Sequence, residues 1–239
     1  MSFDFNYMDS PNRPNGKIEG VMIGIVTNNK DPEGLSRVKL TFPLREANNE
    51  TDWVRVATLM AGKDRGSLFV PEVGDEVLVA FHLGEMSDPY VIGALWNDKA
   101  ASPKGHEKNH IRKFRSRAGH EITFNDDEAD GQIVIKTKKG HKVEIGDKQD
   151  EITIADSNGT NSMTIIGGAK NEITIKSQTQ TIKINAKGEI EVSSVKSLTL
   201  KSVQVNVEAT GTMSLKAGAM LDIKSDGIVN IKGSLVKIN

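Results

Sequence analysis

The chain has 239 residues, a formal net charge of −1 at pH 7 and no cysteine. The near-neutral charge gives no bulk electrostatic argument for binding nucleic acid or an acidic membrane. The missing cysteines exclude a disulfide framework, thiol catalysis and thiolate-bound metal. No basic start followed by an apolar core marks a secretory signal, and no run approaches the ~18 apolar residues of a membrane helix. We therefore expect a soluble protein that is made in a cytoplasm.

The composition changes along the chain. All prolines lie at or before Pro103 and all aromatic residues at or before Phe124. The remainder is dominated by aliphatic residues, lysine, threonine, serine, asparagine and glycine. The length allows one or two domains. We expect four parts: an N-terminal arm (1–16), a small β-barrel (17–97), a basic connector or neck (98–120) and a repetitive spike (121–239).

The arm at 1–16 is polar and contains Phe3, Phe5 and Tyr7 among prolines and asparagines. Such a composition is typical of a disordered segment. The three aromatic residues leave open a segment that becomes ordered on a partner.

The region 17–97 alternates between apolar and polar residues in short runs separated by turn signals such as Asn48-Asn49 and Gly74-Asp75. Five short strands in about 80 residues suit a Greek-key barrel of the OB-fold type. The expected strands are Ile18–Val26, Arg37–Phe42, Trp53–Leu59, Glu76–Leu83 and Tyr90–Leu95.

OB-fold barrels often bind nucleic acid through aromatic side chains paired on a basic face. Here the aromatic residues are scattered among the expected strands, which favours a role in the core. These residues are Phe42, Trp53, Phe69, Phe81 and Trp96. We therefore expect no nucleic-acid partner.

Two segments of the barrel region resemble a known family. They are Gly66–Phe81, which contains Pro-Glu-Val-Gly-Asp-Glu-Val, and Asp88–Asn97, which contains Pro-Tyr-Val-Ile-Gly-Ala-Leu-Trp-Asn. Both are similar to the OB domain of contractile-tail spike proteins, namely the phage baseplate protein V family and the spike part of type VI secretion VgrG proteins. In this segment Gly74 permits a tight turn, and Val77, Val79 and Phe81 share one face of a strand.

The connector is basic, with six Lys or Arg and one Glu between Lys104 and Arg117, and with His106 and His110 interleaved. One interpretation is an anion-binding or nucleic-acid patch; the other, which we favour, is a neck whose charges face water. A basic run this short gives only weak non-specific affinity for nucleic acid.

Pairs of apolar residues at positions i and i+2 repeat from Ile122/Phe124 to Val236/Ile238. Successive pairs start 9 to 11 residues apart up to Ile182 and 7 or 8 residues apart after it. Residues i and i+2 point to the same side of a strand, so each unit has one narrow apolar stripe that needs neighbours to cover it. Gly-His followed by such a pair, at 119–124 and 140–145, also resembles the start of the β-helical needle in the spike family.

Two architectures satisfy this repeat. A single-chain solenoid with three strands per coil predicts a period near 24, whereas an intertwined homotrimer, in which each chain supplies one strand to every layer, predicts a period of one strand. No longer period is evident, which favours an all-β chain with a trimeric, triple-stranded β-helix needle. Its expected axial core is Ile173, Ile175, Ile182, Ile184, Leu198, Leu200, Val205, Val207, Met213, Leu215, Leu221, Ile223, Val229 and Ile231.

Metal and cofactor sites find little support. Asp126-x-Glu128-x-Asp130-Gly131 resembles the start of a calcium loop, but its twelfth position is Thr137 instead of Glu. A polar hairpin turn is the favoured interpretation. The five histidines form neither His-x-His nor a helical His-x-x-x-His pair. We expect no catalytic residue, metal or cofactor.

The resemblance also implies partners. Some spike proteins end in a His-x-His that binds iron, and the last residues here lack it. The resemblance then implies a blunt end that binds a PAAR-type tip protein through Leu235, Val236, Lys237, Ile238 and Asn239. It further implies a hub or tube-initiator protein on the N-terminal side, and it allows an effector cargo.

The most specific functional hypothesis is therefore a structural central spike of a contractile injection particle, not an enzyme. It would be assembled from bacterial cytoplasm into a phage-tail-like baseplate, dock under a hub and tube, and pierce a target envelope. The alternative is a single-chain β-solenoid enzyme or adhesin that acts on cell-surface polysaccharide.

Overall fold

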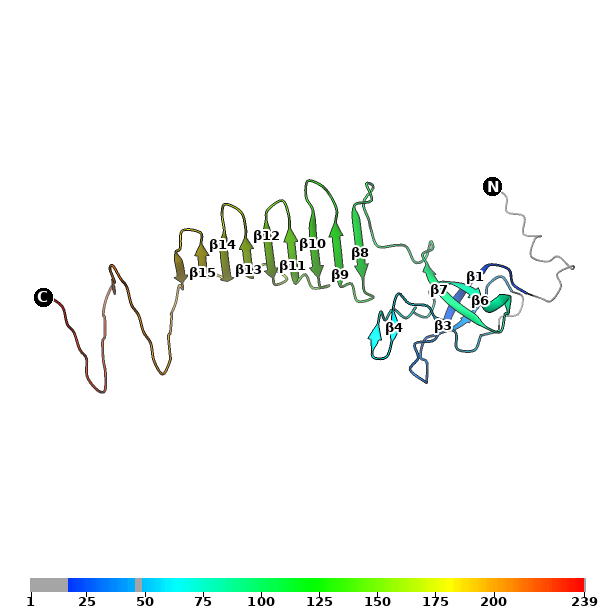
Figure 1. Cartoon of the computed structure of the whole chain (residues 1–239), viewed down its shortest axis with the longest axis horizontal. Helices are drawn as coiled ribbons and strands as arrows, with labels where there is room; N and C mark the ends of the chain where they lie inside the picture. Colours follow the sequence, from blue (N-terminus) through cyan, green and yellow to red (C-terminus); the bar gives the residue numbers. More distant parts are fainter. Residues whose placement is uncertain (1–16, 46–48, 239) are drawn as a thin grey trace.

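The computed structural model describes residues 17–45 and 49–238. It contains a barrel and a long flat sheet joined by residues 96–110 (Figure 1). The arm at 1–16, Asn48 of one expected turn and Asn239 of the expected tip lie outside the described residues. Within the described part, strands account for every regular element except the short 3-10 helix η2 (His82–Gly84). The chain is all-β, as the sequence predicts.

Five strands form the barrel sheet in the order β2-β1-β6-β7-β3. Neighbours are antiparallel except β3 and β7, which are parallel. The backbones of Val38 and Val54, beside the two edge strands, exchange hydrogen bonds of 3.0 and 2.7 Å, which closes the sheet into a barrel. The strands are β1 (Val21–Asn28), β2 (Lys39–Thr41), β3 (Arg55–Val56), β6 (Glu76–Phe81) and β7 (Pro89–Leu95).

The barrel encloses the buried core of the chain. Val77, Val79 and Phe81 alternate with partly exposed residues along β6 and are buried, which confirms the predicted face of this strand. The rings of Phe42 and Phe81 lie 5.9 Å apart. The other core members are Val26, Val38, Leu40, Val54 and Val91.

The core role predicted for all five barrel aromatics is wrong for Phe69 and Trp96, which are each 72% exposed. Phe69 follows a hairpin that projects from the barrel, and Trp96 follows the last residue of β7. Both lie just beyond regular strands, where the backbone no longer directs alternate side chains into the barrel. Trp53 is partly exposed.

The projecting hairpin consists of β4 (Ala61–Gly62) and β5 (Arg65–Gly66). The strand expected at Trp53–Leu59 forms only as β3, because the chain then leaves the barrel to enter this hairpin. Leu59 is consequently 93% exposed. No turn signal within 53–59 indicates this departure.

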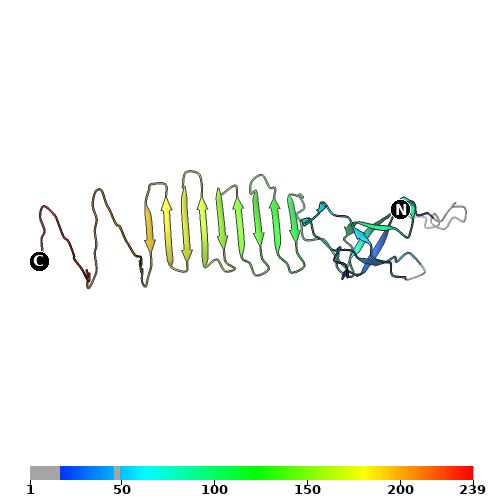
Figure 2. The same ribbon diagram turned by 60° about the horizontal axis from the view of Figure 1, so that its bottom comes forward.

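Nine further strands form a second sheet in which each strand pairs antiparallel with the next along the chain (Figure 2). The result is a flat meander from Ile111 to Ser193. The strands are β8 (Ile111–Arg115), β9 (Glu121–Asn125), β10 (Gln132–Lys136), β11 (Lys142–Gly146), β12 (Glu151–Ala155), β13 (Asn161–Ile166), β14 (Glu172–Ser177), β15 (Gln180–Asn185) and β16 (Ile190–Ser193).

The meander differs from the sequence-based expectation in two respects. It begins with β8, inside the segment assigned to the connector, and its strands pair within one chain instead of alternating with strands of other copies. The repeat of 9 to 11 residues accommodates a five- or six-residue strand and a reversing turn, and the 8-residue step from Ile182 to Ile190 still does so between β15 and β16. Residues 194–238, which carry the shorter repeat, contain no strand in this structure.

Candidate functional site

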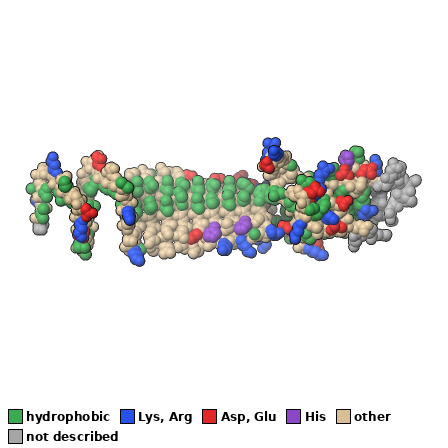
Figure 3. All heavy atoms as spheres, turned by 90° about the horizontal axis from the view of Figure 1, so that it is seen from below, with side chains coloured by type: hydrophobic (Ala, Val, Ile, Leu, Met, Phe, Trp, Pro, Cys, Tyr) green, Lys and Arg blue, Asp and Glu red, His purple; other side chains and the backbone are tan. Residues whose placement is uncertain are grey.

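The most prominent surface of the molecule is the apolar face of the meander. On this face, residues that lie opposite each other on neighbouring strands are both apolar. Examples are Ile133 opposite Ile145, Ile154 opposite Met163, and Ile175 opposite Ile182. The pairs form two rows that run along the sheet, and Figure 3 shows them as a continuous hydrophobic stripe. The in-register alternation of Ile with Thr, Glu and Lys along each strand produces this face.

This face has no cover within the described part of the chain. Ile135 is 49% exposed and Ile154 is 50% exposed, although both sit mid-sheet. A sheet normally buries its apolar face against a second layer, and contiguous apolar patches beyond a few hundred Å² mark interaction sites on monomeric proteins. The face therefore has the chemistry of an assembly interface.

The opposite face of the meander is polar. Its central row includes Thr153, Thr164, Thr174 and Lys183, which are cross-strand neighbours in sequence order. The Lys183 ammonium lies 2.6 Å from the Glu172 carboxylate, and this hydrogen bond lowers the pKa of Glu172 and raises the pKa of Lys183. This is a face suited to water.

The structure divides the expected core residues into two groups. Ile173, Ile175, Ile182 and Ile184 lie together on the apolar face. The rest lie in 194–238, where each is between about half and three-quarters exposed, so that their role as an axial core stays a prediction. This second group is Leu198, Leu200, Val205, Val207, Met213, Leu215, Leu221, Ile223, Val229 and Ile231. The sequence missed Phe114 of β8, which lies opposite Ile122 and extends the face toward the barrel.

The junction between barrel and meander is polar. Arg117 donates a 3.0 Å hydrogen bond to Glu72 in the barrel turn before β6. Beside this ion pair lies an open cavity bordered by Trp96 and Pro103 of the connecting segment and by Arg115 at the end of β8. Part of the basic connector thus belongs to the sheet and its junction with the barrel.

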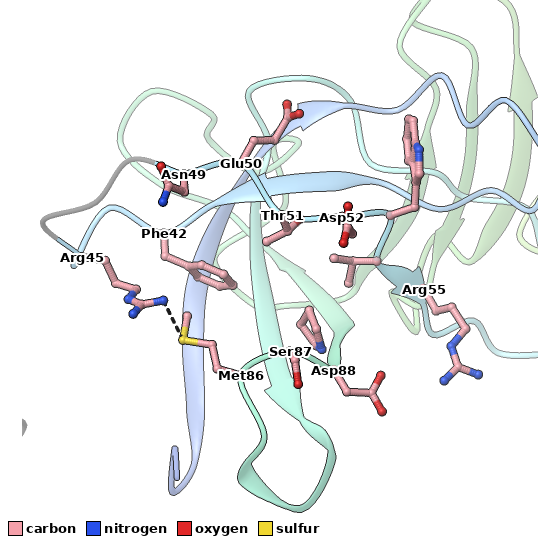
Figure 4. A pocket seen from close by; sticks show the side chains of 13 residues that line it. Phe42, Arg45, Asn49, Glu50, Thr51, Asp52, Arg55, Met86, Ser87 and Asp88 are labelled. Carbon is pink, nitrogen blue, oxygen red and sulfur yellow. Dashed lines mark hydrogen bonds between the residues drawn. The ribbon is translucent and has the colours of Figure 1, made fainter. Parts of the chain in front are cut away.

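A second open cavity, of about 320 Å³, lies on the barrel (Figure 4). Met86, Ser87 and Asp88 of the β6–β7 turn form one side, and Arg45 donates a hydrogen bond to the Met86 sulfur. β7 runs from this turn back toward the meander, so the cavity lies at the barrel end that faces away from the sheet (Figure 1).

The residues that resemble a calcium loop form the turn between β9 and β10. Asp127 accepts a hydrogen bond from the amide of Ala129, and Asn125 donates one to the carbonyl of Asp130. These contacts confirm the interpretation as a polar hairpin turn. The described residues include no group of three or more His, Cys, Asp or Glu side chains arranged to hold a metal ion.

His106 and His110 stack with their ring centroids 4.1 Å apart in the connecting segment. The His110 Nδ1 lies 3.9 Å from a carboxylate oxygen of Asp127. This cluster connects the joining segment to the edge of the meander.

Among the helices of the described residues, none is long and apolar enough to cross a membrane.

Comparison with known proteins identifies the barrel. Residues 22–96 match the family model of the type VI secretion system/phage-baseplate injector OB domain. This range runs from the second residue of β1 to the residue after β7, and so includes the whole closed sheet.

The curated relatives include type VI secretion spike proteins and a toxin. The chain is 28% identical to the type VI secretion system spike protein VgrG3 of Vibrio cholerae over 137 residues, which are 52% of this chain and 14% of the relative. It is 27% identical to the spike protein VgrG1b of Pseudomonas aeruginosa over 150 residues, which are 56% of this chain and 20% of the relative. It is also 27% identical to the actin cross-linking toxin VgrG1 of V. cholerae over 144 residues, which are 53% of this chain and 13% of the relative.

The chain thus spans a fifth or less of the length of these relatives. The matched family domain and the closed five-stranded barrel of the structure occupy the same residues. Residues 22–96 match the injector OB domain of type VI secretion systems and phage baseplates, and the chain is similar to VgrG spike proteins over about half of its length.

Proposed function

We propose that this chain is the central spike of a contractile injection particle, and that it works as a homotrimer. The observation that carries the proposal is the uncovered apolar face of the meander, which runs from Phe114 to Val192. Three identical sheets, each turning this face toward a common axis, would form a three-sided prism with a dry aliphatic interior and a polar exterior. Nine strands spaced about 4.8 Å apart would give a stiff rod.

Beyond Ser193 the proposal requires the three chains to wind around one another. An extended segment with a narrow apolar stripe cannot bury that stripe alone, and residues 194–238 form no strand that pairs within the described chain. The apolar pairs from Leu198 to Ile231 would then meet the corresponding pairs of two other copies. This segment narrows the spike toward its tip.

The two ends of the spike would bind different partners. The open cavity beside Met86, at the barrel end that faces away from the sheet, is the surface that would meet a hub and tube. At the other end, Leu235, Val236 and Ile238 are exposed and Lys237 lies among them, which suits contact with a PAAR-type tip protein. An effector cargo would travel through such a partner.

A single-chain solenoid that acts on polysaccharide is the weaker alternative. A solenoid pairs each strand with one in the next coil, whereas every strand from β8 to β16 pairs with its neighbour in sequence. The chain is therefore proposed to act mechanically and not as an enzyme.

The proposal is tested by expressing the full chain with an affinity tag in its native host. It predicts recovery of the tagged chain in large particles together with sheath and tube proteins, and its loss from those particles when Ile184 is replaced by Asp. Recovery only as a free protein, or attached to glycans, would contradict a spike function.

A further inference from the structure

The two long edges of the meander carry opposite charge. In an antiparallel meander, alternate turns lie at opposite edges of the sheet, so the turns after β8 and β10 share one edge and the turns after β9 and β11 share the other. Figure 3 shows histidine, lysine and arginine side chains along one side of the hydrophobic stripe next to the barrel, and aspartate and glutamate along the other.

The first edge is basic. Residues 115–121 and 136–142 contain six Lys or Arg against one acid, Glu121, which already pairs with Arg115 at 3.0 Å. In the part of the chain that the structure describes, Lys138 and Lys139 lie within 4.0 Å of no carboxylate. We call residues 115–121 and 136–142 the basic edge.

The second edge is acidic. Residues 126–131 and 147–151 contain seven carboxylates against one cation, Lys148. Only Asp127 among these carboxylates has a cationic partner within 4.0 Å in the described chain, and that partner is His110. Lys104 and Lys108 precede β8 on the same side, with Glu107 between them, and they leave this edge with a net negative charge. We call residues 126–131 and 147–151 the acidic edge.

We propose that the acidic edge of one copy docks on the basic edge of the next copy, and that this electrostatic seam closes the sheets into a ring and sets their common register. The inference rests on the proposed homotrimer. When identical sheets turn the same face toward a common axis, one edge of each sheet meets the opposite edge of its neighbour. Such a head-to-tail contact places unlike charges together at every interface.

The heights of the turns strengthen the proposal. Copies related by a rotation axis along the spike lie at the same level, so the acidic turn after β9 faces a gap between two basic turns of its neighbour. Those basic turns follow β8 and β10, and each lies one strand spacing, about 4.8 Å, from the level of the acidic turn. Turns at one edge repeat every two strands, so the acidic turn lies midway between them. The acidic and basic turns would therefore interdigitate, and a slip by one strand would bring each turn level with a turn instead of a gap.

The seam lies in the half of the meander nearest the barrel. Farther along, on the same side as the basic edge, the turn after β12 carries one acid, Asp156, and the turn after β14 carries no charge. On the side of the acidic edge, the turn after β13 carries Lys170 and the turn after β15 carries Lys187 and Glu189, so the charge difference is confined to the turns nearest the barrel. The apolar face supplies adhesion along the whole sheet, but hydrophobic contact is non-directional. Charges next to the barrel would fix the alignment where the flat sheets begin.

The test uses charge reversal in the full chain. Lys138→Glu/Lys139→Glu lowers the net charge of the basic edge from +5 to +1. Glu128→Lys/Asp130→Lys changes that of the acidic edge from −6 to −2 while preserving the turn contacts, which use the Asp127 side chain and the Asp130 backbone. The control Lys30→Glu/Lys99→Glu makes the same charge change as the first variant at one exposed lysine of the barrel and one of the connecting segment. Trimer dissociation is followed in denaturant at low and at high salt.

We expect each edge variant to dissociate about tenfold faster than the control at low salt. The chain with all four edge substitutions should be no more stable than either edge variant, because its two edges then carry net charges of only +1 and −2. The differences should shrink at 1 M salt, where the screening length is about 3 Å. Trimers of both edge variants that match the control would overturn the seam and leave the proposed spike intact, whereas a monomeric wild-type chain would overturn both.

Coexpression guards against variants that fail to assemble. When the two edge variants carry different tags and are made together, the seam predicts mixed trimers in excess over either pure trimer, because mixing brings unlike edges together. Random mixing of the two tags would contradict it.

Discussion

Ile173 of β14 lies directly opposite Ile184 of β15 on the apolar face of the meander. Neither residue has a second layer above it among residues 17–45 and 49–238, and Ile184 is 41% exposed. Burying one isoleucine side chain fully contributes roughly 1.5–3 kcal/mol. Covering this face with another sheet would therefore stabilise the assembly at both residues.

Ile184→Asp should convert the trimer to monomer at micromolar concentration, because three carboxylates would meet at a dry axis. Thr164→Asp is the matched control, since Thr164 lies on the polar face of β13. Light scattering of both variants gives the result. A trimer that survives Ile184→Asp would show that this face does not point to the axis.

Leu40→Ala should lower the free energy of unfolding of the barrel by about 2–5 kcal/mol, because Leu40 is fully buried and its removal leaves a cavity. The same substitution at Leu59, which is 93% exposed, should change it by less than about 0.5 kcal/mol. Urea unfolding followed by tryptophan fluorescence compares them. Equal effects would show that the barrel core is misplaced.

Gly74→Ala should destabilise the turn before β6 by about 1–2 kcal/mol, because Gly74 has φ of 95° and a side chain there strains the backbone. Gly93→Ala is the control. An added methyl group meets open space at Gly74 and at Gly93 alike, but Gly93 does not have a positive φ. The urea midpoints of the two variants should differ. Matching midpoints would contradict the assigned turn conformation.

Asp31 anchors the loop between β1 and β2. Its carboxylate accepts hydrogen bonds from the Arg37 guanidinium at 2.8 and 2.9 Å and from the amides of Glu33, Leu35 and Arg37. The Arg37 hydrogen bonds hold the pKa of Asp31 well below its usual range. A carboxyl group whose pKa is lower in the folded state stabilises that state above its unfolded pKa, about 3.9, and this contribution is lost as the pH falls further.

Asp31→Asn should therefore lower the urea midpoint of the barrel by a constant amount from pH 7 to about pH 5, and the gap to the wild type should narrow below about pH 4. The exposed Asp98, changed to Asn, serves as control and should show no such gap. A gap that widens with acidification would have the wrong sign for this ion pair.

Strand faces were predictable because alternation directly reports which side chains share a side. Val77, Val79 and Phe81 illustrate this in the barrel, and Ile173 with Ile175 in the meander. The change in repeat length near Ile182 was also visible, but its meaning was not. The steps of 9 to 11 residues all lie within the antiparallel meander, but so does the 8-residue step from Ile182 to Ile190, so the repeat length alone does not mark where the meander ends.

Other features left no signal in the sequence. β8 reads Ile-Arg-Lys-Phe-Arg, and its charges disguise an edge strand that pairs with β9. The exposed positions of Phe69 and Trp96 depend on where the chain leaves the barrel, which local alternation does not encode. The charge difference between the sheet edges appears only once the turns are sorted by edge, because basic and acidic turns alternate along the chain and cancel in the net charge.

Three copies of the chain are proposed to share one apolar core, and the mass of the full chain in solution shows how many copies assemble. Sedimentation equilibrium at micromolar concentration should give three times the chain mass of 26.0 kDa. A single species of 26.0 kDa would mean that the apolar face stays uncovered by other copies, and it would contradict the trimeric spike.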